Sequence, residues 1–284
     1  MSIIALVFDY DDTIVPDSTT QLLRRYGIDT NYFWKFEFKN LVSLGYDPIF
    51  AVLKLILDKI DKDKPLGELT NEKLKEIGEE ISSSQYPGFD SLISDLKELC
   101  STQRDISIEF YVISGGLEEI IRGNRLISDN FSGIYGCRLA GDDNSSELKY
   151  IKRAITFTEK TRYLFEINKG ISQTDSDKDP SAVNRKIKEE ERTIPFKNMI
   201  YIGDGLTDIP CFSLVDKNGG ISFAVLHHDK DSDAKIRIFE DILLTKRAIS
   251  TNSPQYSEDD DLGHLIRHTV ANICSKIMLD RSKA

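Results

Sequence analysis

Four short apolar runs divide the chain, and each has the length of a β-strand. They cover residues 3–8, 106–113, 198–202 and 221–226 and contain many β-branched and aromatic side chains. Their apolarity is continuous rather than alternating, which is typical of strands that are covered on both faces of a parallel sheet. A helix-like spacing of apolar residues at 89–100 precedes the second run. This alternation predicts an α/β fold with a three-layer, Rossmann-like core around a mainly parallel sheet.

Residues 16–86 contain no convincing strand. Four helix-like segments occupy this range, at 18–27, 30–45, 47–60 and 70–81. The third of them begins with Asp47 and Pro48, a favoured start for a helix. We therefore predict a small all-helical cap domain, 16–86, which lies over the end of the first strand. The catalytic core would then consist of residues 1–15 and 87–284.

Polar residues follow three of the apolar runs where each predicted strand ends. They are Asp9, Asp11 and Thr13 after the first run, Ser114, Gly115 and Gly116 after the second, and Asp204 and Asp208 after the third. Ligands of open α/β sheets collect beyond the carboxyl ends of the strands, so we expect these residues at one edge. Crowded carboxylates require a cation, and oxygen ligands suit Mg²⁺. The glycine turn and the serine hydroxyl could hold a phosphate.

Such a site also requires a fixed positive charge. Lys169 follows residues 161–167, a further strand-like run, and is the best candidate by this criterion. Lys160 and Lys178 are weaker alternatives, because each lies in a polar, loop-like segment.

The composition narrows the choice of partners. The formal net charge of −10 argues against nucleic acid or an anionic membrane as a partner. The scattered cysteines, four in number, favour buried thiols over a disulfide or zinc framework. No basic stretch precedes the first apolar run, and its six residues are too few for a signal peptide or a membrane span. We expect a cytoplasmic protein, and its oligomeric state is left open.

The motifs and their order resemble those of the haloacid dehalogenase (HAD) superfamily. The matching segments are D-x-D-x-T at 9–13, Ser-Gly-Gly at 114–116, the downstream Lys169, and G-D-x-x-x-D at 203–208. The helical insertion between the first two motifs is similar to the cap of the phosphoserine phosphatase-like branch. The resemblance implies a phosphatase that uses Mg²⁺ to hydrolyse the phosphate monoester of a small metabolite.

The resemblance also implies roles for the residues in catalysis. Asp9 would be the nucleophile that forms an aspartyl-phosphate. Asp11 would protonate the leaving oxygen and later act as a base on water, with Thr13 orienting it by a hydrogen bond. Lys169 would neutralise charge on Asp9 and the phosphate.

Binding roles follow from the same resemblance. The phosphoryl oxygens would be held by Ser114, Gly115 and Gly116. Mg²⁺ would lie between the carboxylates of Asp9 and Asp204 and the main-chain carbonyl of Asp11, with Asp208 behind them.

Two positions refine the expected chemistry. Asp11 indicates phosphate esters rather than carbon–halogen bonds, because an oxygen leaving group needs a proton. The phosphoserine-specific members carry a glutamate at the position of Ser18, so this serine argues against phosphoserine as the substrate. A phosphotransferase that uses the same aspartyl-phosphate stays open as an alternative. So does a catalytically silent module that binds metal or protein.

Overall fold

A seven-stranded sheet forms the centre of the computed structural model, which describes residues 1–142, 146–227, 240, 245 and 248–283. The strand order is β4-β3-β2-β1-β5-β6-β7. The strands are β1 (Ser2–Phe8), β2 (Ile106–Leu117), β3 (Gly133–Ala140), β4 (Tyr150–Arg153), β5 (Met199–Gly203), β6 (Ile221–Val225) and β7 (Ser250–Asn252). Neighbouring strands are parallel except for β3 and β4. The predicted Rossmann-like α/β core with a mainly parallel sheet is confirmed.

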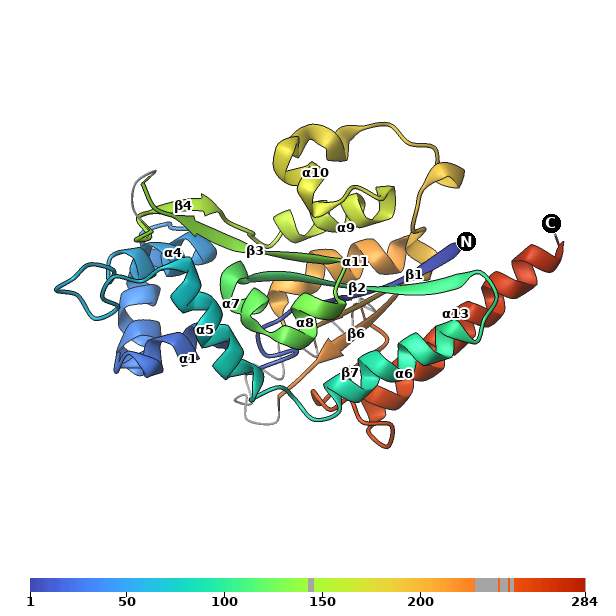
Figure 1. Cartoon of the computed structure of the whole chain (residues 1–284), viewed down its shortest axis with the longest axis horizontal. Coiled ribbons are helices and arrows are strands. Elements are labelled where there is room, and N and C mark those ends of the chain that lie inside the picture. Colours follow the sequence, from blue (N-terminus) through green and yellow to red (C-terminus); the bar gives the residue numbers. More distant parts are fainter. Residues whose placement is uncertain (143–145, 228–239, 241–244, 246–247, 284) are drawn as a thin grey trace.

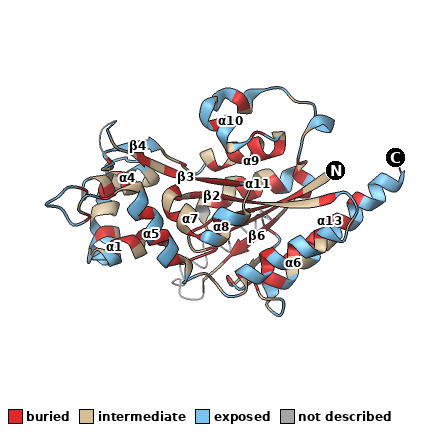
Figure 2. Cartoon of the chain, in the orientation of Figure 1, coloured by how far each residue is buried: buried red, intermediate tan, exposed pale blue. Residues whose placement is uncertain are grey.

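The four predicted strands are β1, β2, β5 and β6, and they form the middle of the sheet. Their side chains are buried on both faces, which explains the continuous apolar runs (Figure 2). The strands absent from the prediction are short, polar or interrupted by glycine. β3 contains Gly133 and Gly136, and β4 and β7 are short strands at the two edges.

Helices cover both faces of the sheet. On one face α6 (Phe89–Ser101) packs against α13 (Asp261–Lys283), and on the other α9 (Glu159–Lys169) packs against α11 (Ile209–Lys217) (Figure 1). The shorter elements are α7 (Glu118–Gly123), α8 (Arg125–Asn130), α10 (Gln173–Lys178), η2 (Pro180–Asn184), η3 (Glu189–Glu191), η4 (Phe196–Asn198) and η5 (Leu206–Asp208). This arrangement gives the three predicted layers.

Residues 16–86 are helical, as predicted, at one end of the molecule (Figure 1). The elements are α1 (Ser18–Arg25), α2 (Thr30–Tyr32), the π-helix η1 (Phe33–Phe38), α3 (Lys39–Ser43), α4 (Pro48–Leu57) and α5 (Asn71–Ser82). Asp47 caps α4 by accepting from the amides of Ile49 and Phe50. The division of the chain into a core and a cap domain stays a prediction.

Helix α5 anchors this helical segment to the core through a contact with α7. A side chain at Gly78 would collide with the main-chain carbonyl of Ile120, and one at Gly123 would collide with that of Lys75. Only glycine permits such a close approach of two helix backbones. The last helix of the predicted cap is therefore packed tightly on the core.

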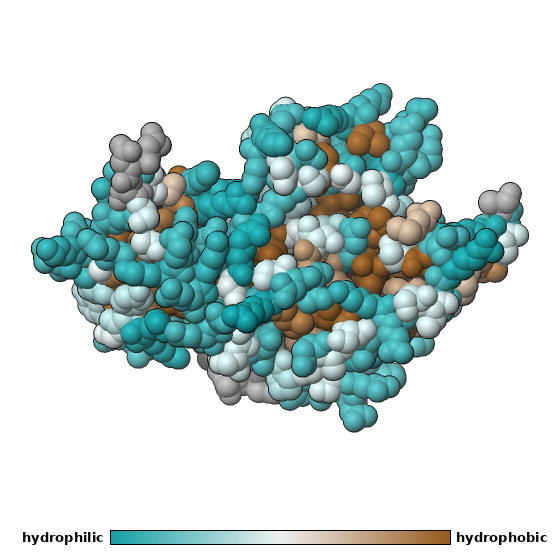
Figure 3. All heavy atoms as spheres, viewed as in Figure 1, coloured by the Kyte–Doolittle hydropathy of each residue, from teal (hydrophilic) through white to brown (hydrophobic). Residues whose placement is uncertain are grey.

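The surface and the cysteines agree with the composition. Hydrophilic residues cover most of the face in Figure 3, and apolar residues are visible mainly near its middle. All four cysteines are buried and unpaired, as expected from their spacing. Within the described residues, no helix has the length and apolarity to cross a membrane.

Candidate active site

The register of the central strands brings the predicted motifs to one edge. Phe8 of β1 pairs with Val112 of β2 on one side and with Ile202 of β5 on the other. The three strands are parallel, so the residues that follow them emerge together at their carboxyl ends. Asp9 continues the ladder, since its amide donates to the carbonyl of Ile202 at 2.8 Å. The site predicted beyond these strand ends is therefore assembled by sheet pairing.

A tight turn follows β1. The carbonyl of Tyr10 accepts from the amides of residues 13, 14 and 15, and Asp12 adopts a left-handed conformation with φ of 54°. Two distant side chains hold the turn: a ring nitrogen of His227 lies 2.6 Å from the Asp12 carbonyl, and the Tyr256 hydroxyl donates to the Thr13 carbonyl at 2.7 Å. The positions of Asp9 and Asp11 are thus fixed by the core rather than by the turn alone.

The Asp9 carboxylate is buried and has a donor on each oxygen. The amide of Tyr10 donates to Oδ1 at 2.8 Å, and Nζ of Lys160 lies 3.0 Å from Oδ2. Burial raises the pKa of Asp9 well above its ordinary value, Lys160 opposes this shift, and the neighbouring carboxylates of Asp208, Asp204 and Asp11 add to it. A further cation at this position would favour the charged form.

Lys160 supplies the positive charge of the site. Its Nζ also lies 2.7 Å from Oδ1 of Asp208, so it bridges two carboxylates from inside the core. Burial lowers the pKa of Lys160, but the charges of Asp208 and Asp9 outweigh burial and raise it above its usual range. The side chain is therefore a buried ammonium ion.

The prediction that Lys169 provides this charge is wrong. Its Nζ donates to the carbonyls of Val183 at 2.5 Å and Arg185 at 2.8 Å, away from the carboxylates. The error came from residues 161–167, which form part of helix α9 and not a strand. In a helix, Lys160 shares the buried face with Tyr163, Leu164 and Ile167, and this spacing was the signal that could have identified it.

Asp11 lies beside Asp9 in the lining of the same cavity and is partly buried. Its Oδ1 accepts from the amide of Ser18 at 2.7 Å. Burial, with the charge of Asp17 as the next cause, raises the pKa of Asp11 from 3.8 to about 7. The predicted hydrogen bond from Thr13 to Asp11 is absent: the Thr13 hydroxyl is buried and makes no hydrogen bond within the described residues. The start of helix α1 orients Asp11 instead, because that helix presents the Ser18 amide.

The Ser114–Gly116 turn packs directly against Asp11. The Gly116 amide donates to Oγ of Ser114 at 3.0 Å, and a Cβ added at Gly116 would lie 2.5 Å from Oδ2 of Asp11. A Cβ at Gly115 would lie 2.8 Å from Cδ1 of Ile49 in α4. A side chain at Gly116 would therefore displace the Asp11 carboxylate, whereas one at Gly115 would displace only the flexible end of Ile49.

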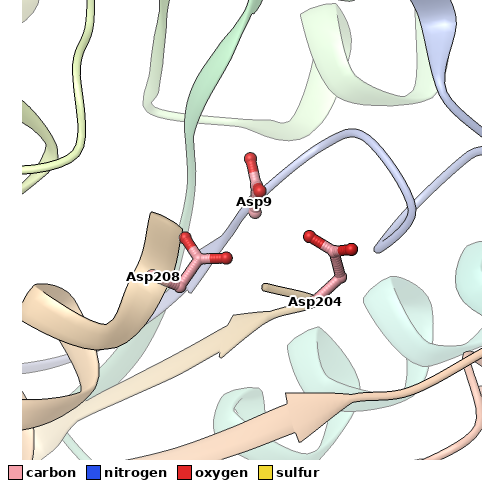
Figure 4. A group of neighbouring side chains, drawn as sticks. All are labelled: Asp9, Asp204 and Asp208. Carbon is pink, nitrogen blue, oxygen red and sulfur yellow. The ribbon is translucent and has the colours of Figure 1, made fainter. Parts of the chain in front are cut away.

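The predicted acidic cluster forms at the end of β5. Asp9, Asp204 and Asp208 each offer a carboxylate oxygen within 4.8 Å of the others, around a common space (Figure 4). Asp208 is fully buried and accepts from the Tyr201 hydroxyl at 2.7 Å and the Gly205 amide at 3.3 Å. Oxygen donors of this kind fit a hard divalent cation. Asp208 is already bound by three donors, which suits it to hold its neighbours in place.

A cavity opens over these side chains. It is lined by most of the predicted residues, Asp9, Asp11, Ser114, Gly115, Gly116 and Asp204, together with Lys160. Thr13 and Asp208 lie behind this lining and are fully buried. The arrangement combines a paired carboxylate, a second carboxylate that can hold a proton at neutral pH, and a turn that can bind an anion.

Comparison of the sequence with known proteins assigns no function to the chain. No model of a known protein family matches the chain. It is 26% identical over 264 residues to an uncharacterized protein of Borreliella burgdorferi, an alignment that covers 84% of this chain and 88% of that protein.

Two solved structures resemble the chain in fold at low sequence identity. A HAD family hydrolase from Salmonella enterica serovar Typhi superposes with a TM-score of 0.55 at 15% identity, covering 88% of this chain and 67% of that chain. A gene product of Archaeoglobus fulgidus superposes with a TM-score of 0.50 at 12% identity, covering 93% and 83%. The chain therefore has the fold of the haloacid dehalogenase superfamily.

Proposed function

We propose that this protein is a HAD-type phosphatase that hydrolyses the phosphate monoester of a small metabolite with the help of Mg²⁺. The observation that supports this most strongly is the buried Asp9, held 3.0 Å from the Lys160 ammonium and next to Asp11. A carboxylate in this setting can attack phosphorus, because the lysine offsets the charge that gathers when a phosphate approaches.

In the first step, a carboxylate oxygen of Asp9 attacks the phosphorus atom and the bond from phosphorus to the ester oxygen breaks. Asp11 gives its proton to that oxygen, so the product leaves as an alcohol. A pKa of about 7 suits Asp11 to this task at neutral pH. Its Oδ1 accepts from the Ser18 amide, which leaves Oδ2 as the oxygen that carries the proton.

In the second step, water attacks the phosphorus of the aspartyl-phosphate. Asp11, now a carboxylate, takes the proton from that water, and the bond between phosphorus and the Asp9 oxygen breaks. Inorganic phosphate and the starting carboxylate are regenerated. During both steps the Ser114 hydroxyl and the amides of the Ser114–Gly116 turn hold the phosphoryl oxygens.

The acidic cluster supports a metal-dependent reaction. Mg²⁺ would be held by the carboxylates of Asp9 and Asp204 and the main-chain carbonyl of Asp11. When bound it supplies positive charge that draws the phosphate towards Asp9. Asp208 would keep Lys160 and the turn at Gly205 in position through its hydrogen bonds.

Phosphate release from 4-nitrophenyl phosphate with Mg²⁺ tests this proposal. We expect turnover by the native protein and none by Asp9→Asn. The native protein and the variant should show the same thermal unfolding transition. Asp129→Asn, at an exposed aspartate of α8, is the matched control and should keep full activity. Turnover by Asp9→Asn would contradict the assignment of the nucleophile. Transfer of phosphate to an added alcohol, faster than its release to water, would favour the phosphotransferase.

A further inference from the structure

The cavity over Asp9 has an apolar wall. This wall consists of Trp34, Ile49, Val52, Ile155 and Phe157. It is rigid at one point, because Nε1 of Trp34 donates to the hydroxyl of Thr20 at 2.8 Å. The whole cavity measures about 250 Å³, smaller than the roughly 300–1,000 Å³ of pockets for drug-sized ligands. It suits a phosphate with a compact alcohol.

The charged groups of the cavity are almost all acidic. Asp9, Asp11 and Asp204 belong to the proposed catalytic set, and Asp12 and Asp17 are two further carboxylates of the lining. Among the described residues of the lining, Lys160 is the single basic side chain, and it already contacts Asp9 and Asp208. A carboxylate on the leaving group would therefore meet the carboxylates of Asp12 and Asp17 and apolar side chains, with no basic side chain of the described lining besides Lys160 to pair with it.

We propose, resting on the phosphatase function above, that the substrate is the phosphate ester of a compact, largely apolar alcohol that carries no negative charge of its own. Like charges brought together in a closed site are strongly disfavoured, and a protein uses such repulsion to reject competing ligands. The phosphate itself is accepted, because Lys160, the glycine turn and the metal meet it. An anionic leaving group finds no such partner within the described lining.

Matched pairs of substrates that differ by one carboxylate test this proposal. The pairs are phenyl phosphate with 4-carboxyphenyl phosphate, and phosphoethanolamine with O-phosphoserine. We expect kcat/KM to be at least about tenfold higher for the member without the carboxylate in each pair. Equal values, or a preference for the carboxylates, would overturn the proposal while leaving the phosphatase function intact. No phosphate release from any of the four would overturn the phosphatase function, and this proposal with it.

A pair of variants at Phe157 tests whether the apolar wall is responsible for the preference against a carboxylate on the leaving group. Phe157 lines the cavity and is 37% exposed, so a longer polar side chain fits there without burial. Phe157→Arg adds a positive charge, and we expect it to shift the ratio within each pair towards the carboxylate by about tenfold. Phe157→Leu removes the ring without adding charge and should keep the native ratio. The same ratio in both variants would contradict the proposal.

Discussion

The ammonium of Lys160 lies 3.0 Å from the carboxylate of Asp9, in the interior of the protein. The pair joins the first turn of α9 to the end of β1, two elements far apart in the sequence. Because Lys160 is also 2.7 Å from Asp208, one side chain connects the proposed nucleophile to a fully buried residue of the acidic cluster. This relationship separates Lys160 from every other lysine that the sequence offered for the role.

Replacing Lys160 and Lys169 by methionine, one at a time, tests which lysine supplies the positive charge of the site. We expect Lys160→Met to lower kcat/KM for 4-nitrophenyl phosphate by about 10²–10³-fold, because it removes the charge beside Asp9 and the phosphate. Lys169→Met should stay within about twofold of the native rate, since its amine binds main-chain carbonyls outside the site.

Thermal unfolding of both variants provides the control for this comparison. Lys160→Met leaves Asp9 and Asp208 close together without their shared cation, so addition of Mg²⁺ should stabilise it. A larger loss of activity in Lys169→Met than in Lys160→Met would falsify the assignment of the site cation.

The role of Asp11 as an acid predicts a dependence on the leaving group. Asp11→Asn keeps the acceptor for the Ser18 amide but cannot give a proton to the ester oxygen. We expect the rate of aspartyl-phosphate formation to fall by about 10²–10⁴-fold for alkyl phosphates. The same rate should fall much less for 4-nitrophenyl phosphate, because its phenolate leaves without a proton. Single-turnover release of the alcohol measures this step. An equal loss for both substrates would show that Asp11 has another role.

The pKa of Asp11 predicts how stability changes with pH without metal. Its pKa is about 7 in the folded state against 3.8 ordinarily. From about pH 4 to 7 the folded protein therefore binds a proton that the unfolded chain releases, and the free energy of unfolding falls as the pH rises. The free energy of unfolding of the native protein minus that of Asp11→Asn should therefore fall by on the order of a few kcal/mol as the pH rises across this range. Urea titrations in EDTA measure it, and a constant difference would refute the prediction.

Removal of the metal should abolish activity and lower stability together. Dialysis against EDTA should stop turnover, and added Mg²⁺ should restore it and raise the melting temperature. We expect Asp204→Asn to weaken Mg²⁺ binding by at least about tenfold, because it replaces a charged ligand of the cluster. The shift of melting temperature with Mg²⁺ concentration measures this affinity without any substrate. An unchanged Mg²⁺ response in Asp204→Asn would place the metal elsewhere.

The glycine turn offers a steric test with a matched control. Gly116→Ala would put a methyl group 2.5 Å from Oδ2 of Asp11, so either the turn or the carboxylate must move. We expect at least about a tenfold loss of kcat, with the fold retained. Gly205→Ala would meet the Thr207 hydroxyl, its nearest neighbour among the described residues, at 3.7 Å and should be close to native. Native activity in Gly116→Ala would argue against a fixed Asp11.

The central part of the fold could be predicted from the sequence, because strands that are buried on both faces have continuous apolar sequences. Strands β1, β2, β5 and β6 are covered on both sides, so they are continuous apolar runs. Strand β4 has no buried residue, and its pairing with β3 depends on contacts that the sequence does not display. Partly exposed edge strands lack the signal that identifies central ones.

The acidic part of the site could be predicted for a different reason. Asp9 and Asp204 directly follow buried strands, and parallel pairing alone brings them together. Lys160 comes from a helix that approaches from the side, so its position depends on how α9 packs. The run at 161–167 was too short for its apolar content to distinguish a strand from a buried helix face. The prediction that Thr13 orients Asp11 was wrong, because the Ser18 amide at the start of α1 makes the hydrogen bond to Asp11 instead.

The strand order also determines when the site can exist during synthesis. β1 begins at Ser2, whereas its partner β5 begins only at Met199 and the acidic cluster is completed at Asp208. Contacts between such distant segments form late, because the intervening chain must first be closed into a loop. The nascent protein therefore cannot assemble the acidic cluster until Asp208 has emerged from the ribosome.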